Sequence, residues 1–497
     1  MEPGEPTAPV GPADDETDAL DGWAAAFTAF WAPCAVHFRR REVRERSGKY
    51  VRGLLGPVPR KNGWQVAEAI GERDPVGVQR LLFAARWDER AVQDTLIRTV
   101  AQQWGTQDGV FILDETGFLK KGRKSVGVQR QYSGTAGKVD NCQVAVFLAY
   151  ATAQGHAFLD RRLYLPQEWT DDPARCAEAG VPPTVLFQTK PALGWDLLCH
   201  AWDLGVAGRW VVGDTVYGRD PALRAHLETQ APARHYVLAV PADTRVWTEV
   251  TATVREAGRP GPLEARAYQV LQEATVATYA GHHAQWTRLA VAAGTKGPRT
   301  YDWWAGRVQG EATADPAATR WLLVRRALRD PHEQAYYVSN APADTPLRVL
   351  AQVASQRWAI EQGFEEAKGE TGLDQYEVRQ WQSWHRHVTL ALVAHTFLAN
   401  LRRQALPLPP HPSPEVGVGG KGHRGRRLLA IRYATHSPRA HSVDRPRSAA
   451  PARSRPASAG TFPHDPPALV ALATTPSGHR PPLLLRPSPA TTNSAIP

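Results

Sequence analysis

Apolar residues in the first hundred positions recur at the spacing of one helical face. The clearest set is Trp23, Ala26, Phe27, Phe30 and Trp31. Asp74 directly precedes Pro75, and Asp88 precedes another apolar series, so both acids are typical of residues that cap the start of a helix. The pattern predicts a helical domain over residues 19–105.

Two later apolar runs each lead straight into an acid. Gly109–Leu113 is followed by Asp114, and Gly208–Gly213 is followed by Asp214. A short apolar run bounded by glycines is typical of a strand buried on both faces, with the acid at the strand's end. Residues 194–204 have helical spacing, so we expect a crossover helix that makes the two strands parallel. Both aspartates are then predicted at one edge of a sheet, where open α/β sheets bind their ligands.

Further elements complete the first part of a core that is predicted over residues 106–240. Ser125–Tyr132 and Cys142–Thr152 alternate as the second and third strands of a meander that starts at the first acidic run. Asp220–Pro221 predicts the start of a helix that runs to about Glu228, and Tyr236–Val240 predicts the next strand.

A long segment over residues 241–343 is rich in β-type runs. These are Ala265–Leu271, Gln285–Ala292, Arg320–Arg326 and Ala335–Val338. Because the segment is too long and too apolar for a loop, it predicts a β-rich insertion domain. Helices are expected to complete the core over residues 344–405, the first capped by Asp344-Thr345-Pro346 and the last spanning Trp384–Leu401.

The first of these helices is predicted to continue through a charged face. Arg357, Glu361, Phe364 and Lys368 follow one another at spacings of four, three and four, which places all of them on one side of a helix. The spacing alone leaves two interpretations open. Glu361 is either a functional acid between two cations or half of an ordinary ion pair on a wet surface.

Composition changes the picture by indicating a partner. The chain has 497 residues, 42% of them hydrophobic, and a formal net charge of +10. This balance favours a polyanion, with nucleic acid the first candidate. No apolar stretch is long enough to cross a membrane, so we expect no membrane association. The four cysteines stand far apart and are interpreted as reduced thiols.

Basic residues gather in the predicted helical domain. The cluster is Arg39, Arg40, Arg41, Arg44, Arg46, Lys49, Arg52, Arg60 and Lys61. It is either a solvated face or part of a surface that binds DNA ends, and no helix-turn-helix pattern decides between them. Lys120 and Lys121 form a second basic site directly after the first acidic run.

Both ends of the chain lack the pattern of a packed core. Residues 1–18 are rich in Pro, Gly, Asp and Glu and are predicted to be disordered. Residues 406–497 are rich in Arg, Pro and Ser. This tail is either disordered and basic, helping to hold DNA, or translated out of frame in a decayed gene.

Asp114, Asp214 and Glu361 together are a candidate site for two-metal phosphoryl transfer. Carboxylates on rigid elements are hard oxygen ligands that suit Mg²⁺, and Mn²⁺ accepts the same ligands. A phosphatase with Asp114 as its nucleophile is disfavoured, because Thr116 stands where a second aspartate is needed.

The chain resembles the DDE transposases of bacterial insertion sequences. The resemblance rests on Asp114-Glu-Thr-Gly-Phe-Leu-Lys-Lys-Gly, Ser125-Val-Gly-Val-Gln-Arg-Gln-Tyr-Ser-Gly and Gly213-Asp-Thr-Val-Tyr-Gly. Arg357, Glu361 and Lys368 match the family's Tyr-x2-Arg-x3-Glu-x6-Lys signature, with Ala354 in place of the tyrosine. It covers about residues 20–405.

The resemblance implies an α/β fold and a mechanism. The fold is a ribonuclease H-like mixed sheet flanked by helices, with the β-rich insertion and the N-terminal helical domain; the tail is not part of the resemblance. Asp114, Asp214 and Glu361 would hold two Mg²⁺ ions, while Arg357 and Lys368 would contact DNA phosphates. The implied activity is cleavage at transposon ends and strand transfer to target DNA, by a homodimer in the bacterial cytoplasm at the nucleoid.

Two alternatives share these residues. A plain ribonuclease H-like nuclease would use the same acids without needing the N-terminal helices or the insertion. A catalytically inactive DNA-binding protein descended from a transposase would keep the acids but cut nothing.

Overall fold

The structure, a computed structural model, describes residues 12–232, 234–255, 265–294, 297–309 and 319–405. All of these residues belong to one compact unit. The predictions made for residues 1–11 and 406–497 lie outside the described residues.

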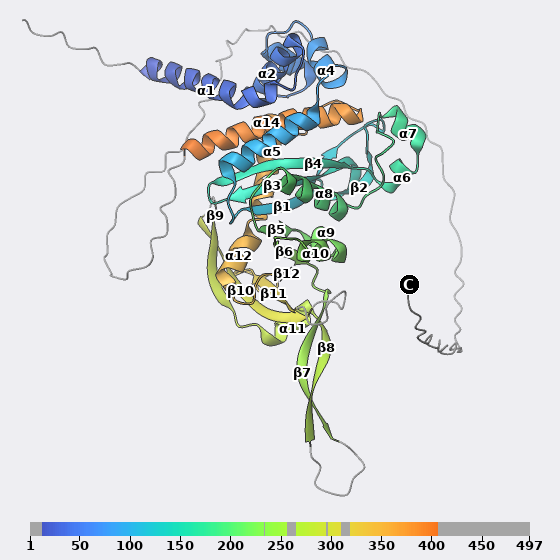
Figure 1. The fold of residues 1–497 in the computed structure, drawn as a ribbon, viewed down its shortest axis with the longest axis vertical. Helices are drawn as coiled ribbons and strands as arrows, with labels where there is room; N and C mark the ends of the chain where they lie inside the picture. Colours follow the sequence, from blue (N-terminus) through green and yellow to red (C-terminus); the bar gives the residue numbers. More distant parts are fainter. Residues whose placement is uncertain (1–11, 233, 256–264, 295–296, 310–318, 406–497) are drawn as a thin grey trace, which may run out of the picture. The chain divides into compact units, whose positions relative to one another are not determined.

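Helices and strands of this unit form a mixed α/β fold with a twelve-stranded sheet, as expected (Figure 1). The strands of its first half are β1 (Val110–Leu119), β2 (Gln129–Ser133), β3 (Lys138–Thr152), β4 (Gly155–Tyr164), β5 (Trp210–Gly213) and β6 (His235–Val240). β4, β3 and β1 are antiparallel neighbours, and β1, β5 and β6 are parallel neighbours. This is the strand arrangement of a ribonuclease H-like core.

The predicted meander is wrong in its order, because β3 and not β2 lies beside β1. β3 is almost wholly buried from Cys142 to Ala151, whereas β2, with the sequence Gln-Arg-Gln-Tyr-Ser, alternates between half-buried and exposed positions. A strand in the middle of a covered sheet needs apolar side chains on both faces. β3 meets that requirement, and β2 pairs only with the far edge of β3.

The segment over residues 241–343 continues the same sheet. Its elements are β7 (Arg245–Arg255), β8 (Ala265–Thr275), α11 (Val276–His283), β9 (Thr287–Gly294), β10 (Gly297–Gln309), β11 (Thr319–Arg326) and β12 (Gln334–Ser339). β12 pairs with β6, and the order then runs β11, β10, β7 and β8. The four predicted β-type runs all lie on strands. β10 was not predicted, because Asp302 interrupts its apolar pattern. The Asp302 carboxylate forms ion pairs with Arg288 and Arg326 on the neighbouring strands.

The described residues before the sheet form five helices, where the spacing predicted a helical segment. They are α1 (Pro12–Ala35), α2 (Arg41–Leu55), α3 (Gly63–Ala69), α4 (Val76–Phe83) and α5 (Glu89–Trp104). α1 begins at Pro12, upstream of the predicted start at Ala19. Asp88 caps α5 as expected, accepting hydrogen bonds from the backbone N–H groups of Arg90 and Ala91.

The last helix, α14 (Trp381–Ala405), is longer than predicted and joins the N-terminal helices to the sheet. It is buried on nearly every side from Ser383 to Phe397. Such a helix packs against neighbours all round rather than along one stripe. It contacts α2 and α4 of the N-terminal helices, lies beside α5, and packs on β4 (Figure 1). Phe397 meets Phe27 of α1 edge to face, with ring centroids 5.3 Å apart.

Shorter helices connect the core strands. α6 (Gln167–Thr170) and α7 (Pro173–Glu178) follow β4, and α8 (Lys190–Asp203) is the crossover helix that precedes β5. α8 begins before the predicted Gly194 because Thr189 caps it. α9 (Thr215–Gly218) and α10 (Pro221–Glu228) lead to β6, and Asp220 caps α10 as predicted.

The helix predicted to run from Leu347 through Lys368 is in fact two helices. α12 (Leu347–Ser355) and α13 (Trp358–Thr371) are separated by a tight turn. The N–H of Gln356 bonds to the carbonyl of Val353, and the N–H of Ala359 bonds to that of Gln356. These three-residue bonds replace the four-residue α-helical pattern and turn the chain at Arg357. The predicted Asp344–Thr345 cap is also wrong, since α12 follows Pro346 without a side-chain cap.

Candidate active site

Asp114 and Asp214 lie on neighbouring parallel strands, as predicted. The pairing between β1 and β5 ends at Leu113 and Gly213, so each aspartate directly follows the last paired residue, and Asp214 lies just beyond the end of β5. β1 itself continues to Leu119 along β3, and Asp114 therefore does not end its strand as expected. Asp214 caps α9, and its Oδ1 accepts a hydrogen bond of 2.9 Å from the Val216 N–H.

Arg357 connects the two distant parts of the site. Its Nη1 lies 3.1 Å from Oδ2 of Asp114, and its Nη2 also bonds to Glu361. One guanidinium at the start of α13 thus bridges a carboxylate of the sheet and a carboxylate of the helix. The ion pair between Arg357 and Asp114 is more than a surface contact, because the side chain of Asp114 is only 13% exposed.

The site holds an excess of negative charge in a buried place. Burial raises the pKa of Asp114 to about 7; Arg357 opposes this rise, while Asp214 and Glu115 add to it. Burial also raises the pKa of Asp214, with Glu115 as the next cause. Carboxylates with raised pKa values in one place are typical of sites that are completed by a cation.

Glu115 is a charged neighbour that the sequence pattern did not single out. Its Oε1 accepts a bond of 2.7 Å from Lys190 Nζ, and its Oε2 accepts one of 3.2 Å from the Tyr217 hydroxyl. Tyr217 is fully buried and belongs to the Gly213–Gly218 motif. The buried tyrosine in that motif was the signal that a polar partner had to lie within reach.

Glycine at position 218 is required by the packing of the same motif. A Cβ at Gly218 would lie 1.8 Å from the carbonyl oxygen of Ala239 on β6. This contact holds α9 directly against the sheet. The short helix that begins at Asp214 is therefore fixed by backbone contact.

Lys368 lies in the last turn of α13, and its side chain reaches the sheet. Its Nζ donates hydrogen bonds of 2.8 Å to Thr116 Oγ1 and 3.1 Å to Thr135 Oγ1. Thr116 is two residues beyond Asp114 on β1, so Lys368 and Arg357 both meet the strand that carries the first aspartate. Burial lowers the pKa of Lys368.

The other predicted DNA contacts are spread over two regions. Arg39, Arg40 and Arg41 are exposed at the start of α2, where Arg41 also pairs with Glu45 at 2.7 Å. No described contact joins them to the three acids.

Lys120 and Lys121 differ in their surroundings. Lys120 turns inward, with its Nζ 3.6 Å from the centre of the Tyr376 ring, and burial lowers its pKa to about 8. Lys121 is exposed.

Two members of the N-terminal basic cluster are held by contacts within the protein. Arg46 pairs with Glu72 at 2.6 Å, and Lys61 is buried with its Nζ donating to the Gly56 carbonyl at 2.6 Å. The cluster is therefore smaller on the surface than the sequence suggests.

Ala354 stands where the resembled signature has tyrosine. It is buried in α12 within the main hydrophobic cluster, with 5% of its surface exposed. A side chain at this position in the described structure points into the protein.

Comparison with known proteins assigns the chain to a family. Residues 33–298 match the family of DDE superfamily endonucleases. The chain belongs to that family, and the family relationship expected from the motifs is confirmed. A relative from Microchaete diplosiphon, named "Probable transposase for insertion sequence element IS701", is 30% identical over 167 residues. That match covers 33% of this chain and 41% of the relative, so the chain spans less than half the length of the curated protein it matches.

Among the described residues, no helix is both long and apolar enough to cross a membrane.

Proposed function

We propose that this chain is the DNA transposase of an insertion sequence. The observation that carries the proposal is the meeting of Asp114, on β1, with Glu361, on α13, through the guanidinium of Arg357, beside Asp214. Membership of an endonuclease family and the name of the similar protein support the same class of reaction.

The donor set suits divalent cations. Asp114, Asp214 and Glu361 offer carboxylate oxygens, and the raised pKa values of the two aspartates indicate charge that a cation would offset. We propose that these three residues hold two Mg²⁺ ions, with Mn²⁺ as the alternative, which would supply charge stabilisation to the attacking and leaving oxygens. Arg357 would then release at least one of its carboxylates and turn toward DNA.

The chain's own residues have separate tasks in this reaction. In the first step water adds to a phosphodiester at the transposon end, one P–O bond breaks and a 3′-hydroxyl is freed. In the second step this hydroxyl attacks a target phosphodiester, forming one P–O bond while another breaks. Arg357 and Lys368 would offset phosphate charge, since a guanidinium pairs with two phosphate oxygens and an ammonium with one.

The proposal includes DNA as the partner, in the form of terminal repeats and target DNA. The exposed Arg39, Arg40, Arg41 and Lys121 would contribute attraction that does not depend on sequence. We further propose that the chain acts as a homodimer on paired transposon ends, in the cytoplasm at the nucleoid.

Cleavage of labelled DNA that carries the element's own terminal repeat tests the proposal. We expect cutting at the repeat boundary with Mg²⁺ and none with EDTA. Asp114→Asn, Asp214→Asn and Glu361→Gln are each expected to abolish cleavage while repeat binding persists. A chain that ends near Gln404 would test whether the tail matters.

The two alternatives predict different results. A plain nuclease would cut DNA with and without the repeat equally. An inactive DNA-binding protein would bind the repeat with no metal-dependent nicking.

A further inference from the structure

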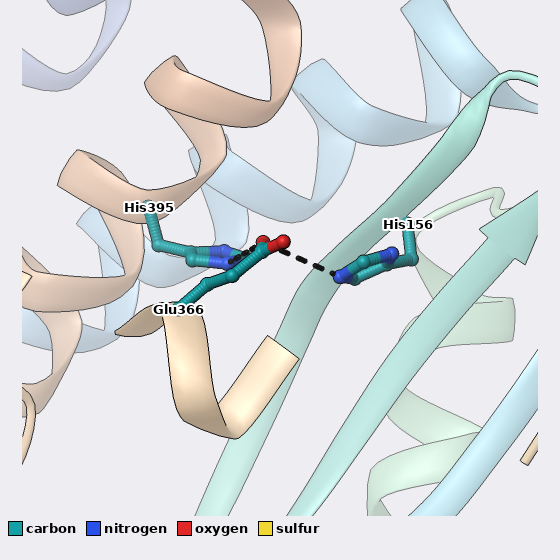
Figure 2. Close-up of side chains that lie close together, drawn as sticks. All are labelled: His156, Glu366 and His395. Atoms are coloured by element: carbon teal, nitrogen blue, oxygen red, sulfur yellow. Dashed lines mark ion pairs between the residues drawn. The ribbon is translucent and has the colours of Figure 1, made fainter. Parts of the chain in front are cut away.

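A second group of metal-ligating side chains lies apart from the three acids. His156 comes from β4, Glu366 from α13 and His395 from α14, and Figure 2 shows the Glu366 carboxylate between the two imidazole rings. The donor atoms of the three residues lie within 4.8 Å of one another. Within the described part of the chain, this is the one trio of His, Cys, Asp or Glu at such a spacing.

The imidazole nitrogens of this group lack hydrogen-bond partners. His395 is 1% exposed, and neither of its ring nitrogens makes a hydrogen bond to the described residues. Nε2 of His156 is also buried and makes no hydrogen bond to the described residues. Buried polar atoms without a partner are rare in folded proteins, and a bound ion is one established reason for them.

The distances fit coordination better than hydrogen bonding. Oε2 of Glu366 lies 3.4 Å from Nε2 of His395 and 3.6 Å from Nε2 of His156. A normal N–H···O hydrogen bond spans about 2.7–3.2 Å. Two ligands of a tetrahedral zinc ion, with bonds of about 2.0–2.1 Å, lie about 3.3 Å apart. The two measured distances lie near that edge length.

We propose that His156, Glu366 and His395 form a binding site for one Zn²⁺ ion. Two imidazole nitrogens and one carboxylate oxygen suit zinc, whereas Mg²⁺ prefers oxygen ligands alone.

Arg402 is the neighbour with which the ion would compete. Its Nη1 lies 2.6 Å from the same Glu366 oxygen. The same side chain also donates from Nη2 to both carboxylate oxygens of Glu370, each at 2.8 Å. Glu370 can therefore keep Arg402 when the metal takes its place on Glu366.

A metal here would fix the helix that carries the predicted catalytic glutamate. Glu366 is five residues after Glu361, so the two acids lie on different sides of α13. The ion would tie the inner side of α13 to β4 and α14, while the outer side keeps Glu361 at Arg357. The site is thus structural and separate from the three acids, and it does not depend on the proposed function.

Zinc content of the purified full-length chain tests this inference. The protein is dialysed against Zn²⁺ and then against metal-free buffer, and bound zinc is measured by elemental analysis. We expect one tightly held zinc per chain, and Co²⁺ in its place should give the visible absorption of a tetrahedral site. His395→Gln and Glu366→Gln should each weaken zinc binding at least tenfold.

Matched variants keep the test decisive if a buried substitution disturbs folding. His156→Gln changes a partly exposed ligand and should also weaken zinc binding tenfold, with an unchanged circular dichroism spectrum. Asp214→Asn should keep the zinc, and Arg402→Gln should bind it more tightly. A wild-type chain without zinc, or one whose zinc content the three ligand variants leave unchanged, would overturn the inference whether or not the chain cleaves DNA.

Discussion

At the scale of single residues, burial and Arg357 act in opposite directions on the pKa of Asp114. Burial disfavours the charged form of Asp114, and the guanidinium 3.1 Å away favours it. The motifs singled out Asp114, Asp214, Glu361, Arg357 and Lys368. In the structure Arg357 pairs with Asp114 and Glu361, and Lys368 bonds to Thr116 on the strand of Asp114, while the catalytic roles of the five residues stay predictions. The motifs could not identify Glu115, because its role depends on Lys190 and Tyr217, which only the fold brings to it.

Replacing Asp114 by asparagine is expected to stabilise the metal-free protein. The folded-state pKa of about 7 lies above the ordinary 3.8, so the protonated form is favoured by folding. The contribution of protonated Asp114 to the free energy of unfolding is therefore full below about pH 4 and is lost as the pH rises to about 7. At pH 8 the ionised group costs at most about 4 kcal/mol, from roughly 1.4 kcal/mol for each tenfold change.

Thermal unfolding of Asp114→Asn and wild type at pH 5 and pH 8, in EDTA, measures this effect. The melting temperature of the variant should exceed that of wild type by more at pH 8 than at pH 5. An equal difference at both values would contradict the raised pKa.

Removing the guanidinium should shift the pH dependence of cleavage. Arg357 lowers the pKa of Asp114, so in Arg357→Gln this pKa rises above about 7 and less carboxylate is ionised at neutral pH. The acid limb of the rate profile, at a fixed Mg²⁺ concentration, should move to higher pH. Lys368→Gln is the control, because Lys368 contacts Thr116 and not Asp114; it should lower the rate without moving the limb.

At the scale of elements, apolar patterns predicted which segments are strands and helices but not how they pair. β2 and β3 both alternate well enough to be strands, and only the complete burial of β3 decides which one lies beside β1. The break between α12 and α13 could not be predicted either, since no proline or glycine marks the turn at Gln356–Arg357. That turn nevertheless places Arg357 at the start of α13, between the two carboxylates.

Substitution of Gly218 tests how tightly the element behind Asp214 is held. In Gly218→Ala the new Cβ would meet a backbone oxygen at 1.8 Å, so α9 must move and we expect a loss of about 3 kcal/mol in stability. Gly369→Ala, at an exposed position of α13 where a Cβ would have no atom within 4 Å, should instead gain about 0.5–1 kcal/mol. Urea denaturation of both variants checks the pair; equal effects would argue against the close contact.

At the scale of the whole molecule, positive charge is distributed rather than gathered at the acids. Arg39, Arg40 and Arg41 are exposed, while Arg46 and Lys61 of the same cluster are engaged by the protein itself. The sequence could count these charges but not distinguish free ones from paired ones. We expect only the exposed members to contribute to DNA binding.

The salt dependence of DNA binding measures that distinction. Each phosphate contact contributes about 0.9 to the slope of log affinity against log salt concentration. The double variant Arg39→Ala/Arg40→Ala should lower the slope by about 1.8 on duplex DNA. Arg46→Gln, whose guanidinium already pairs with Glu72, should leave the slope unchanged.

The twelve-stranded sheet also bears on whether the chain can be shortened. β12 pairs with β6, so the strands of residues 241–343 cover the edge at which the core sheet would otherwise end. Cutting out that segment would leave the N–H and carbonyl groups along β6 open to pairing with another chain. We therefore expect a trimmed chain to aggregate rather than to yield a small nuclease, which light scattering of the deletion variant would show. The segment therefore prevents the edge of the core sheet from pairing with other chains.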